Sequence, residues 1–230
     1  GSDLGGEKFL DIKSRFGGFS PDAVVLVATV RALKMHGGVK KDELETENVD
    51  AALEGTANLR KHLENIRKFG LEPVIALNRF PSDTETELKA VLDWAKENGY
   101  KAALSEVWAK GGEGALDLAD QVLAAIDEAG DFHHLYEPED GVENAIETIA
   151  KEVYGASEVQ YVDGAPAALR RLKKNGWDKL PVCMAKTQYS FSDDPTKLGA
   201  PEGHVLHVRD LIPRLGAGFV VALTGSVMTM

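Results

Sequence analysis

The stretch Val24-Val25-Leu26-Val27-Ala28-Thr29-Val30 decides the fold class, because it is an almost unbroken apolar run rich in β-branched residues. Such a run is typical of a strand buried on both faces, as in a parallel sheet. It predicts a strand over Val24–Val30. Two shorter apolar runs follow along the chain, and they predict strands at Pro73–Asn78 and Ala102–Val107.

Helical patterns separate these three predicted strands. Apolar residues recur at helical spacing over residues 59–66 and again over residues 119–126. Between them, Ser82-Asp83-Thr84-Glu85 has the pattern of a capping box, which predicts that another helix begins there. The order strand–helix–strand–helix–strand–helix predicts an α/β fold with a parallel sheet and right-handed crossovers, either P-loop-like or Rossmann-like.

The pattern lapses in a polar stretch over Asp131–Gly141, which we interpret as a connection between two domains. Residues 1–130 would form the parallel α/β domain, and residues 131–230 a second, smaller α/β domain. The elements expected in the second domain are a helix over residues 142–153, a strand at Val159–Val162, a helix at Ala165–Asn175, a strand at Pro181–Ala185 and further strands after Gly203.

Composition narrows the class of protein. The chain has 230 residues, with 26 Lys and Arg against 37 Asp and Glu, so its formal net charge is −11. An acidic chain without basic clusters is a poor nucleic-acid binder. No apolar run approaches the roughly 20 residues that cross a bilayer, and no basic-then-apolar leader opens the chain. With Cys183 as its single cysteine, a cytoplasmic protein is expected.

Ligands of open parallel sheets bind at the carboxyl ends of the strands. The segments that follow the three predicted strands are Thr29–Gly38, Asn78–Asp83 and Trp108–Gly112. Together they bring four basic side chains to one edge: Arg31, Lys34, Arg79 and Lys110. A basic rim on an acidic protein predicts an anionic small ligand, because a local field can outweigh the global charge.

Two aromatic rings follow neighbouring strands at this edge. Phe80 and Trp108 could sandwich a flat heterocycle by stacking, or both could cap the core. Gly37 and Gly38 could let the backbone approach a ligand, or could supply a turn. His36 beside them could contact a phosphate or carboxylate, or hydrogen-bond its own turn. The sequence pattern alone does not choose between the ligand-binding and the structural alternative for these residues.

Two common nucleotide fingerprints are absent from the sequence, since neither G-x-x-x-x-G-K-[ST] nor a G-x-G-x-x-G after a strand occurs. The segment Asn78–Asp83 resembles the asparagine-basic-x-aspartate motif of guanine-nucleotide proteins, with two extra residues before the acid. A long polar loop, Lys186–Pro195, could be functional or could be a plain turn before proline.

The dodecapeptide Val27–Gly38 resembles a signature of the formate–tetrahydrofolate ligase family. The resemblance also includes Asn78–Glu85, Trp108–Gly114, Pro181–Pro195 and Gly216–Met230, so it extends over essentially the whole chain. It implies an ATP-dependent ligase that joins formate to tetrahydrofolate through formyl phosphate and gives 10-formyltetrahydrofolate. The style of the loop within Pro181–Pro195 is bacterial, and bacterial members are typically tetramers that Mg²⁺ and a monovalent cation assist.

The resemblance also implies roles for individual residues. Phe80 and Trp108 would sandwich the pterin, with Leu104 and Pro81 near the same pocket. Catalytic roles would fall to Arg31 and Lys34, and no residue is expected to bind a metal. The residues expected near the nucleotide or the formyl phosphate are Thr29, His36, Gly37, Gly38, Asn78 and Lys110.

The chain also departs from the family, whose members are more than twice as long and carry a P-loop in an N-terminal half. Without that loop, the usual backbone cradle for a triphosphate is missing. We therefore expect a C-terminal fragment that is almost inactive alone and keeps part of the folate pocket. A non-catalytic folate- or nucleotide-binding module and a nucleotide-dependent switch protein are the alternatives.

Overall fold

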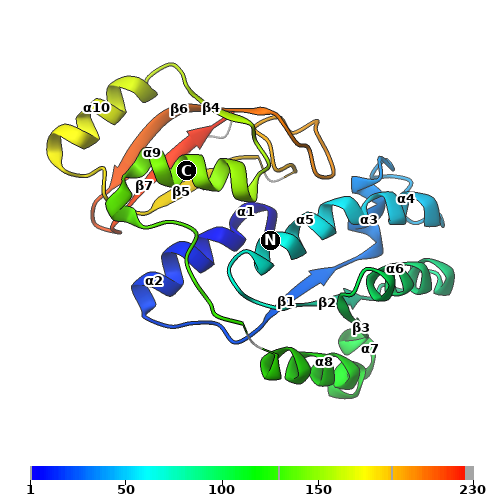
Figure 1. Cartoon of the computed structure of the whole chain (residues 1–230). Coiled ribbons are helices and arrows are strands. Elements are labelled where there is room, and N and C mark those ends of the chain that lie inside the picture. The colour runs from blue at the N-terminus through cyan, green and yellow to red at the C-terminus, as the bar shows by residue number, and fades with distance from the viewer. Residues whose placement is uncertain (1, 129, 188, 226–230) are drawn as a thin grey trace. The chain divides into compact units, whose positions relative to one another are not determined.

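The computed structural model describes residues 2–128, 130–187 and 189–225. They divide into two compact units, shown in Figure 1. The parallel-sheet unit is Pro21–Phe132, and the mixed-sheet unit combines Gly1–Ser20 with His133–Met230. Residues 1–20, which the sequence predicts in the first domain, group here with the second. They contain helical segments that the sequence pattern does not predict. The apolar end at residues 226–230 and Gln188 lie outside the described residues.

The parallel-sheet unit contains a three-stranded parallel sheet in the order β1-β2-β3. These strands are β1 (Val24–Ala28), β2 (Pro73–Asn78) and β3 (Lys101–Ser105). Their carboxyl ends meet at one edge, where Asn78 pairs with Ser105. The predicted α/β fold with a parallel sheet is confirmed.

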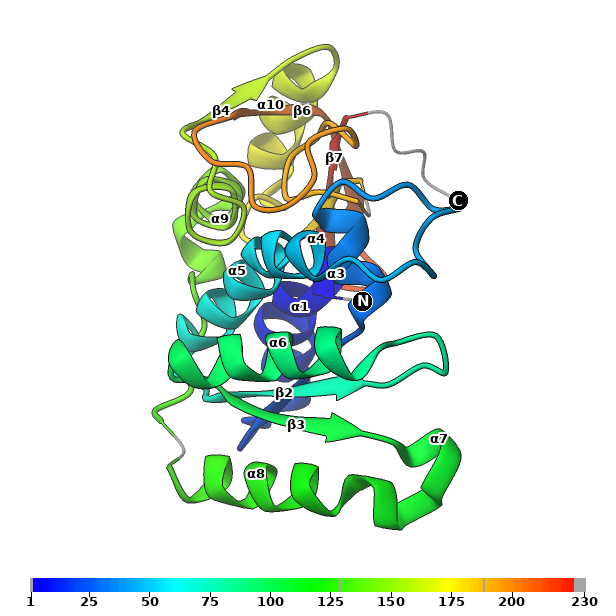
Figure 2. The same cartoon turned by 90° about the vertical axis from the view of Figure 1, so that its right-hand side faces the viewer.

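Helices cover the two faces of this sheet unequally. Helix α5 packs on β1 and β2 and α6 packs on β3, while α8 packs on β2 and β3 from the opposite face (Figures 1 and 2). The helical segments of this unit are α3 (Val30–His36), α4 (Val49–Glu54), α5 (Thr56–Arg67), α6 (Glu85–Glu97), α7 (Val107–Lys110), the 3₁₀ turn η2 (Gly111–Ala115) and α8 (Leu116–Asp127).

Two predicted strands are shorter than expected. Strand β1 ends at Ala28 rather than Val30, because the Thr29 hydroxyl accepts a hydrogen bond from the Ala32 backbone N–H and begins α3. Strand β3 ends at Ser105 rather than Val107. The prediction that β1 is buried on both faces is wrong, since Val27 is 63% exposed.

The capping box of α6 is real but lies two residues later than predicted. Thr84 is the N-cap, its hydroxyl accepts from the Glu87 backbone N–H, and the Glu87 carboxylate accepts from the Thr84 N–H. Ser82 and Glu85 therefore do not form the reciprocal pair. Both tetrapeptides contain hydroxyl-x-x-acid spacing, so the pattern alone does not choose between them.

The mixed-sheet unit contains a four-stranded sheet in the order β4-β6-β7-β5, in which only β6 and β7 pair antiparallel. Its predicted elements are found within a few residues of their expected bounds. Its elements are α1 (Ser2–Glu7), η1 (Lys8–Lys13), α2 (Ser14–Gly17), η3 (Pro138–Asp140), α9 (Val142–Thr148), η4 (Ile149–Val153), β4 (Glu158–Tyr161), α10 (Ala165–Asn175), β5 (Val182–Ala185), β6 (Val205–Arg214) and β7 (Phe219–Thr224).

None of the helices in the described residues has both the length and the apolar character needed to cross a lipid bilayer.

Candidate functional site

A small cavity lies at the carboxyl ends of β2 and β3. It has a volume of about 90 Å³, and we call it the ring cavity; its lining residues are Arg79, Phe80, Pro81, Glu106, Trp108 and Ala109. Two rings that lie 28 residues apart in sequence thus share one cavity, as the positions of the strand ends predict. Trp108 is 83% exposed and Phe80 is 37% exposed, so neither ring is a buried cap of the core.

A tight turn fixes the position of Phe80. The Asp83 carboxylate accepts a hydrogen bond from the Phe80 N–H at 2.8 Å, and the Asp83 N–H donates to the Phe80 carbonyl at 3.0 Å. The second carboxylate oxygen of Asp83 is buried and has no hydrogen-bond partner among the described residues. Burial raises the pKa of Asp83. This acid therefore orders the turn, and its burial argues against a base-reading role in a guanine-nucleotide motif.

The loop that carries Trp108 is held by a close backbone approach. The Glu106 N–H donates to the Gly114 carbonyl at 3.0 Å. A Cβ at Gly114 would lie only 2.5 Å from the Glu106 carbonyl carbon, so this approach requires glycine. Gly111 has a φ of +60° at the end of α7. Gly111 and Gly114 thus serve the geometry of the loop on which Trp108 lies.

Carboxylates neutralise the basic side chains beside the rings. Arg79 pairs with Glu106 at 3.3 Å and also with Glu85. Lys110 pairs with the second carboxylate oxygen of Glu106. The hydrogen bond from Lys110, together with the charge of Arg79, lowers the pKa of Glu106. The edge therefore holds a network of alternating charges instead of the basic rim that the sequence predicts.

Lys34 is not part of the rim, and its predicted place there is wrong. It is 1% exposed, and its ammonium donates to the Glu87 carboxylate at 2.9 Å and to the Thr46 carbonyl at 3.0 Å. Position 34 faces inward because α3 begins at Val30 and buries Val30, Leu33 and Lys34 together. A buried, paired ammonium holds α3 to the start of α6 and does not face a ligand.

The remaining predicted residues of α3 lie along its length. Thr29 caps its start, while Arg31 lies in its first turn and His36 ends it, both half-buried. The Arg31 side chain forms no hydrogen bond or ion pair with the described residues, and its charge offsets part of the rise that burial causes in the pKa of Asp83. The guanidinium of Arg31 is therefore not held in an ion pair within the part of the chain that the structure describes. Asn78, also half-buried, ends β2 near the same strand ends.

Glycine is found at positions 37 and 38 for different structural reasons. A Cβ at Gly37 would lie 2.1 Å from the Ala51 carbonyl oxygen, so the absence of a side chain lets α3 and α4 approach. Gly38 has a φ of +89° with open space around it. For Gly37, packing against α4 accounts for the glycine without a ligand.

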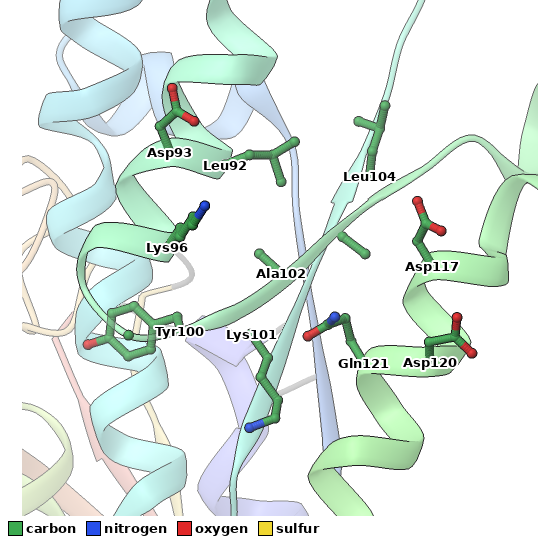
Figure 3. A pocket seen from close by; sticks show the side chains of 12 residues that line it. Leu92, Asp93, Lys96, Tyr100, Lys101, Ala102, Leu104, Asp117, Asp120 and Gln121 are labelled. Atoms are coloured by element: carbon green, nitrogen blue, oxygen red, sulfur yellow. The ribbon is translucent and has the colours of Figure 1, made fainter.

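Leu104 lies in a different cavity from the two rings. It lines an open groove of about 640 Å³ along β3, between α6 and α8. Figure 3 shows this groove with Asp93 and Lys96 on α6 and Asp117 and Asp120 on α8. Its lining mixes charges of both signs.

In the mixed-sheet unit, the predicted polar loop folds around a buried lysine. The Lys186 ammonium donates to the Thr187 and Ser190 carbonyls and lies 5.3 Å from the Tyr154 ring centroid. Cys183 is half-buried, and burial raises the pKa of its thiol. Across the described ranges, no group of three or more His, Cys, Asp or Glu residues could hold a metal ion.

Two acidic residues shape the site without being among the predicted site residues: Glu106, and Asp83, which the sequence suggests only as the acid of a guanine-nucleotide-like motif. Glu106 lies four residues before Lys110, the spacing of a helical ion pair, which is a signal that was present in the sequence. The role of Asp83 follows an Asp-after-Pro turn pattern three residues beyond Phe80.

Comparison with known proteins identifies the family. The family model described as formate–tetrahydrofolate ligase matches residues 1–230. A formate–tetrahydrofolate ligase of Staphylococcus carnosus (strain TM300) is 56% identical over 230 residues, and one of Staphylococcus aureus (strain NCTC 8325 / PS 47) is 57% identical. Each alignment covers 100% of this chain and 41% of the relative, so the chain spans well under half of their length. The chain belongs to the formate–tetrahydrofolate ligase family.

Proposed function

We propose that this chain supplies the pterin pocket and part of the anion-binding edge of an ATP-dependent ligase that joins formate to tetrahydrofolate. The observation that carries the proposal is the ring cavity, in which Phe80 and Trp108 meet at the carboxyl ends of adjacent parallel strands. Family membership gives the ligand, and the strand ends give the place where a parallel sheet binds one.

The pterin is a flat heterocycle, and it would stack between Phe80 and Trp108 with Pro81 at one side. The empty cavity of about 90 Å³ is smaller than the roughly 300 Å³ of small ligand sites. Because Trp108 is 83% exposed on the four-residue helix α7, a small movement of its ring would open the cavity to a pterin. Leu104 would enter the pocket only through such a rearrangement.

Reaction requires the tetrahydrofolate amine to attack the carbonyl carbon of formyl phosphate. The new N–C bond replaces the C–O bond to phosphate, phosphate leaves, and the amine loses its proton. Such an attack depends chiefly on proximity and orientation. Arg31, whose side chain forms no hydrogen bond or ion pair with the described residues, would hold the anionic phosphate, and Thr29, His36, Gly38 and Asn78 would lie beside it.

Lys34 and Gly37 would act indirectly. The Lys34–Glu87 pair fixes α3, and with it Arg31, against α6. Gly37 lets α4 pack on the same helix. Lys110 would become available to an anion only by leaving Glu106. Lys34 and Gly37 are therefore proposed as positioning residues, and Lys110 as a conditional contact of the anion.

The family is expected to use ATP as a substrate and Mg²⁺ and a monovalent cation as cofactors. The sequence has no P-loop, and the described residues hold no cluster suited to a metal, so no step is assigned to the metal. We propose that these 230 residues alone do not catalyse the ligation of formate to tetrahydrofolate. We further propose a cytoplasmic, homo-oligomeric parent enzyme, with no nucleic acid or membrane as partner.

Titration calorimetry of tetrahydrofolate against the 230-residue chain tests the pterin pocket. Phe80→Ala should weaken binding by about 10-fold, since an aromatic stacking contact contributes roughly 1.4 kcal/mol. Phe16→Ala, which removes an exposed phenyl ring in the other unit, is the matched control and should bind as the wild type does. Equal affinity of all three proteins would refute the pocket.

Assay of 10-formyltetrahydrofolate formation from formate and ATP separates the alternatives. A chain that binds tetrahydrofolate without turnover is the result we expect. Robust turnover by these 230 residues would contradict the proposed dependence on the rest of the enzyme.

A further inference from the structure

Helix α8 is apolar on more sides than one packing face requires. Eight of its twelve residues are Leu, Ile, Val or Ala. Its only buried residue is Ala125, while Leu116 and Leu123 are 63% and 60% exposed. A helix that is apolar around most of its circumference is normally covered on several sides.

Helix α8 has two apolar stripes, one toward the sheet and one exposed. The first stripe consists of Leu118, Val122 and Ala125, which repeat at i, i+4 and i+7, and the burial of Ala125 identifies it as the face toward the sheet. Rotation by about 100° per residue places a second stripe beside this face. This second stripe consists of Leu116, Ala119, Leu123 and Ile126.

The direction of the second stripe follows from the groove on the other side of the helix. Asp117, Asp120 and Gln121 line the groove along β3, and Figure 3 shows their side chains on the groove side of α8. The strand β3 is an edge of the described three-stranded sheet, and α8 lies over β3 and β2. The second stripe, on the flank of α8 away from the groove, therefore faces toward β1.

On that side, β1 shows an uncovered apolar face. Val25 pairs with Val74 and Val27 pairs with Ala76, so these four side chains point to the same face of the sheet. α8 covers the two residues of β2, which are 0% and 3% exposed, whereas Val25 and Val27 are 43% and 63% exposed. The other face of β1 is covered by α5.

These residues make one surface, which we call the β1–α8 face: Val25, Val27, Leu116, Leu123 and Ile126. Strands of parallel sheets are covered by helices on both faces. The β1–α8 face lies where a further covering helix would pack beside α8. None of its five side chains is charged. Apolar patches of this kind mark interaction sites.

We propose that the β1–α8 face is the docking surface for an apolar-faced helix from the part of the family's polypeptide that this chain does not span. The relatives supply the reason for this occupant, because the chain covers 41% of their length and leaves more than half of the polypeptide to pack somewhere. The family members' additional length thus completes a layer of this sheet. This inference is independent of the pterin pocket.

Thiol labelling tests the proposal in two proteins. One is the isolated 230-residue chain, and the other is a chimera in which this chain replaces the matched stretch of the Staphylococcus carnosus ligase. Both carry Cys183→Ser and either Val27→Cys or Leu123→Cys. The same chimera without an added cysteine corrects for native thiols, and each chimera in denaturant gives the unprotected rate.

The expected result is fast labelling at both positions in the isolated chain and labelling slowed by about 50-fold or more in the folded chimera, as for buried groups that open rarely. Equal rates at both positions in the two proteins would overturn the proposal. Protection in the isolated chain that grows with protein concentration would show that a second copy covers the face, and this also would overturn it. Far-ultraviolet circular dichroism confirms folding, and the two cysteine positions guard against failure of one variant.

Discussion

The buried pair Lys34–Glu87 yields the sharpest prediction of the structure. The Glu87 carboxylate is 0% exposed and accepts hydrogen bonds from Lys34 at 2.9 Å, the Asn48 N–H at 2.8 Å and the Thr84 N–H at 3.2 Å. Lys34→Met keeps an unbranched side chain of nearly the same length and removes its charge and donors. The variant therefore leaves a buried carboxylate without its counter-ion, and the Thr46 carbonyl without its ammonium donor.

The expected loss of stability is large. Removing one partner of a buried ion pair costs about 3–5 kcal/mol, because the other charge stays desolvated. At an m-value of about 2–3 kcal/mol/M, the urea midpoint of the parallel-sheet unit should fall by about 1–2.5 M. Lys34→Met/Glu87→Gln should recover part of this loss, since no uncompensated charge remains.

The stability that the Lys34–Glu87 pair contributes should also depend on pH in a defined direction. Burial alone would raise the pKa of Glu87, but the hydrogen bonds from Asn48, Lys34 and Thr84 outweigh it and the pKa lies below its ordinary value of 4.5. The stabilisation by Glu87 is thus present above about pH 4.5 and is lost as the pH falls through the folded-state pKa. Without Lys34 the pKa of Glu87 should rise, so wild type and variant should differ most near pH 7 and least near pH 4.

Urea denaturation followed by circular dichroism at both pH values measures these effects. Lys89→Met is the matched control, because Lys89 forms an exposed i,i+4 pair with Asp93 and such pairs contribute little. If Lys34→Met unfolds at the same urea concentration as Lys89→Met, the assignment of Lys34 as a buried anchor is refuted.

Three further predictions concern local structure. Gly37→Ala should destabilise by about 1–3 kcal/mol, since its Cβ would clash with the Ala51 carbonyl; an unchanged thermal midpoint would contradict this packing. Thr84→Ala should cost about 1 kcal/mol through loss of the capping box with Glu87, measured as a lower urea midpoint. Burial raises the pKa of Asp11 to about 7, so its contribution to stability is full below about pH 4 and is lost as the pH rises through 7; Asp11→Asn should flatten the change of urea midpoint between pH 5 and 8, and an unaltered pH profile would exclude this role.

The order of strands and helices could be predicted from the sequence because it depends on periodicity. The apolar run at residues 24–30 marks a strand, and the strand ends then bring Phe80 and Trp108 together. The exact end of β1 could not be predicted, since it depends on whether the Thr29 hydroxyl caps a helix or continues a strand. A β-branched residue suits both roles.

The positions of the charged side chains could not be predicted either. Lys34 lies three residues after Arg31, yet the rotation of α3 buries one and leaves the other half-exposed. The pairing of Arg79 with Glu106 joins residues 27 apart in sequence and needs the loop geometry that Gly114 allows. This contact depends on tertiary structure and leaves no periodic signal, unlike the local i,i+4 pair of Glu106 with Lys110.

The measurement that tests the central claim most directly is the fluorescence of Trp108 alone. Trp94→Phe/Trp177→Phe leaves Trp108 as the only tryptophan of the chain. Because its ring is 83% exposed and lines the ring cavity, stacking of a pterin should quench its emission in a saturable manner, and Phe80→Ala should weaken the quenching by about 10-fold. Emission that stays unchanged up to millimolar tetrahydrofolate, in a chain shown to be folded, would contradict the proposed pocket.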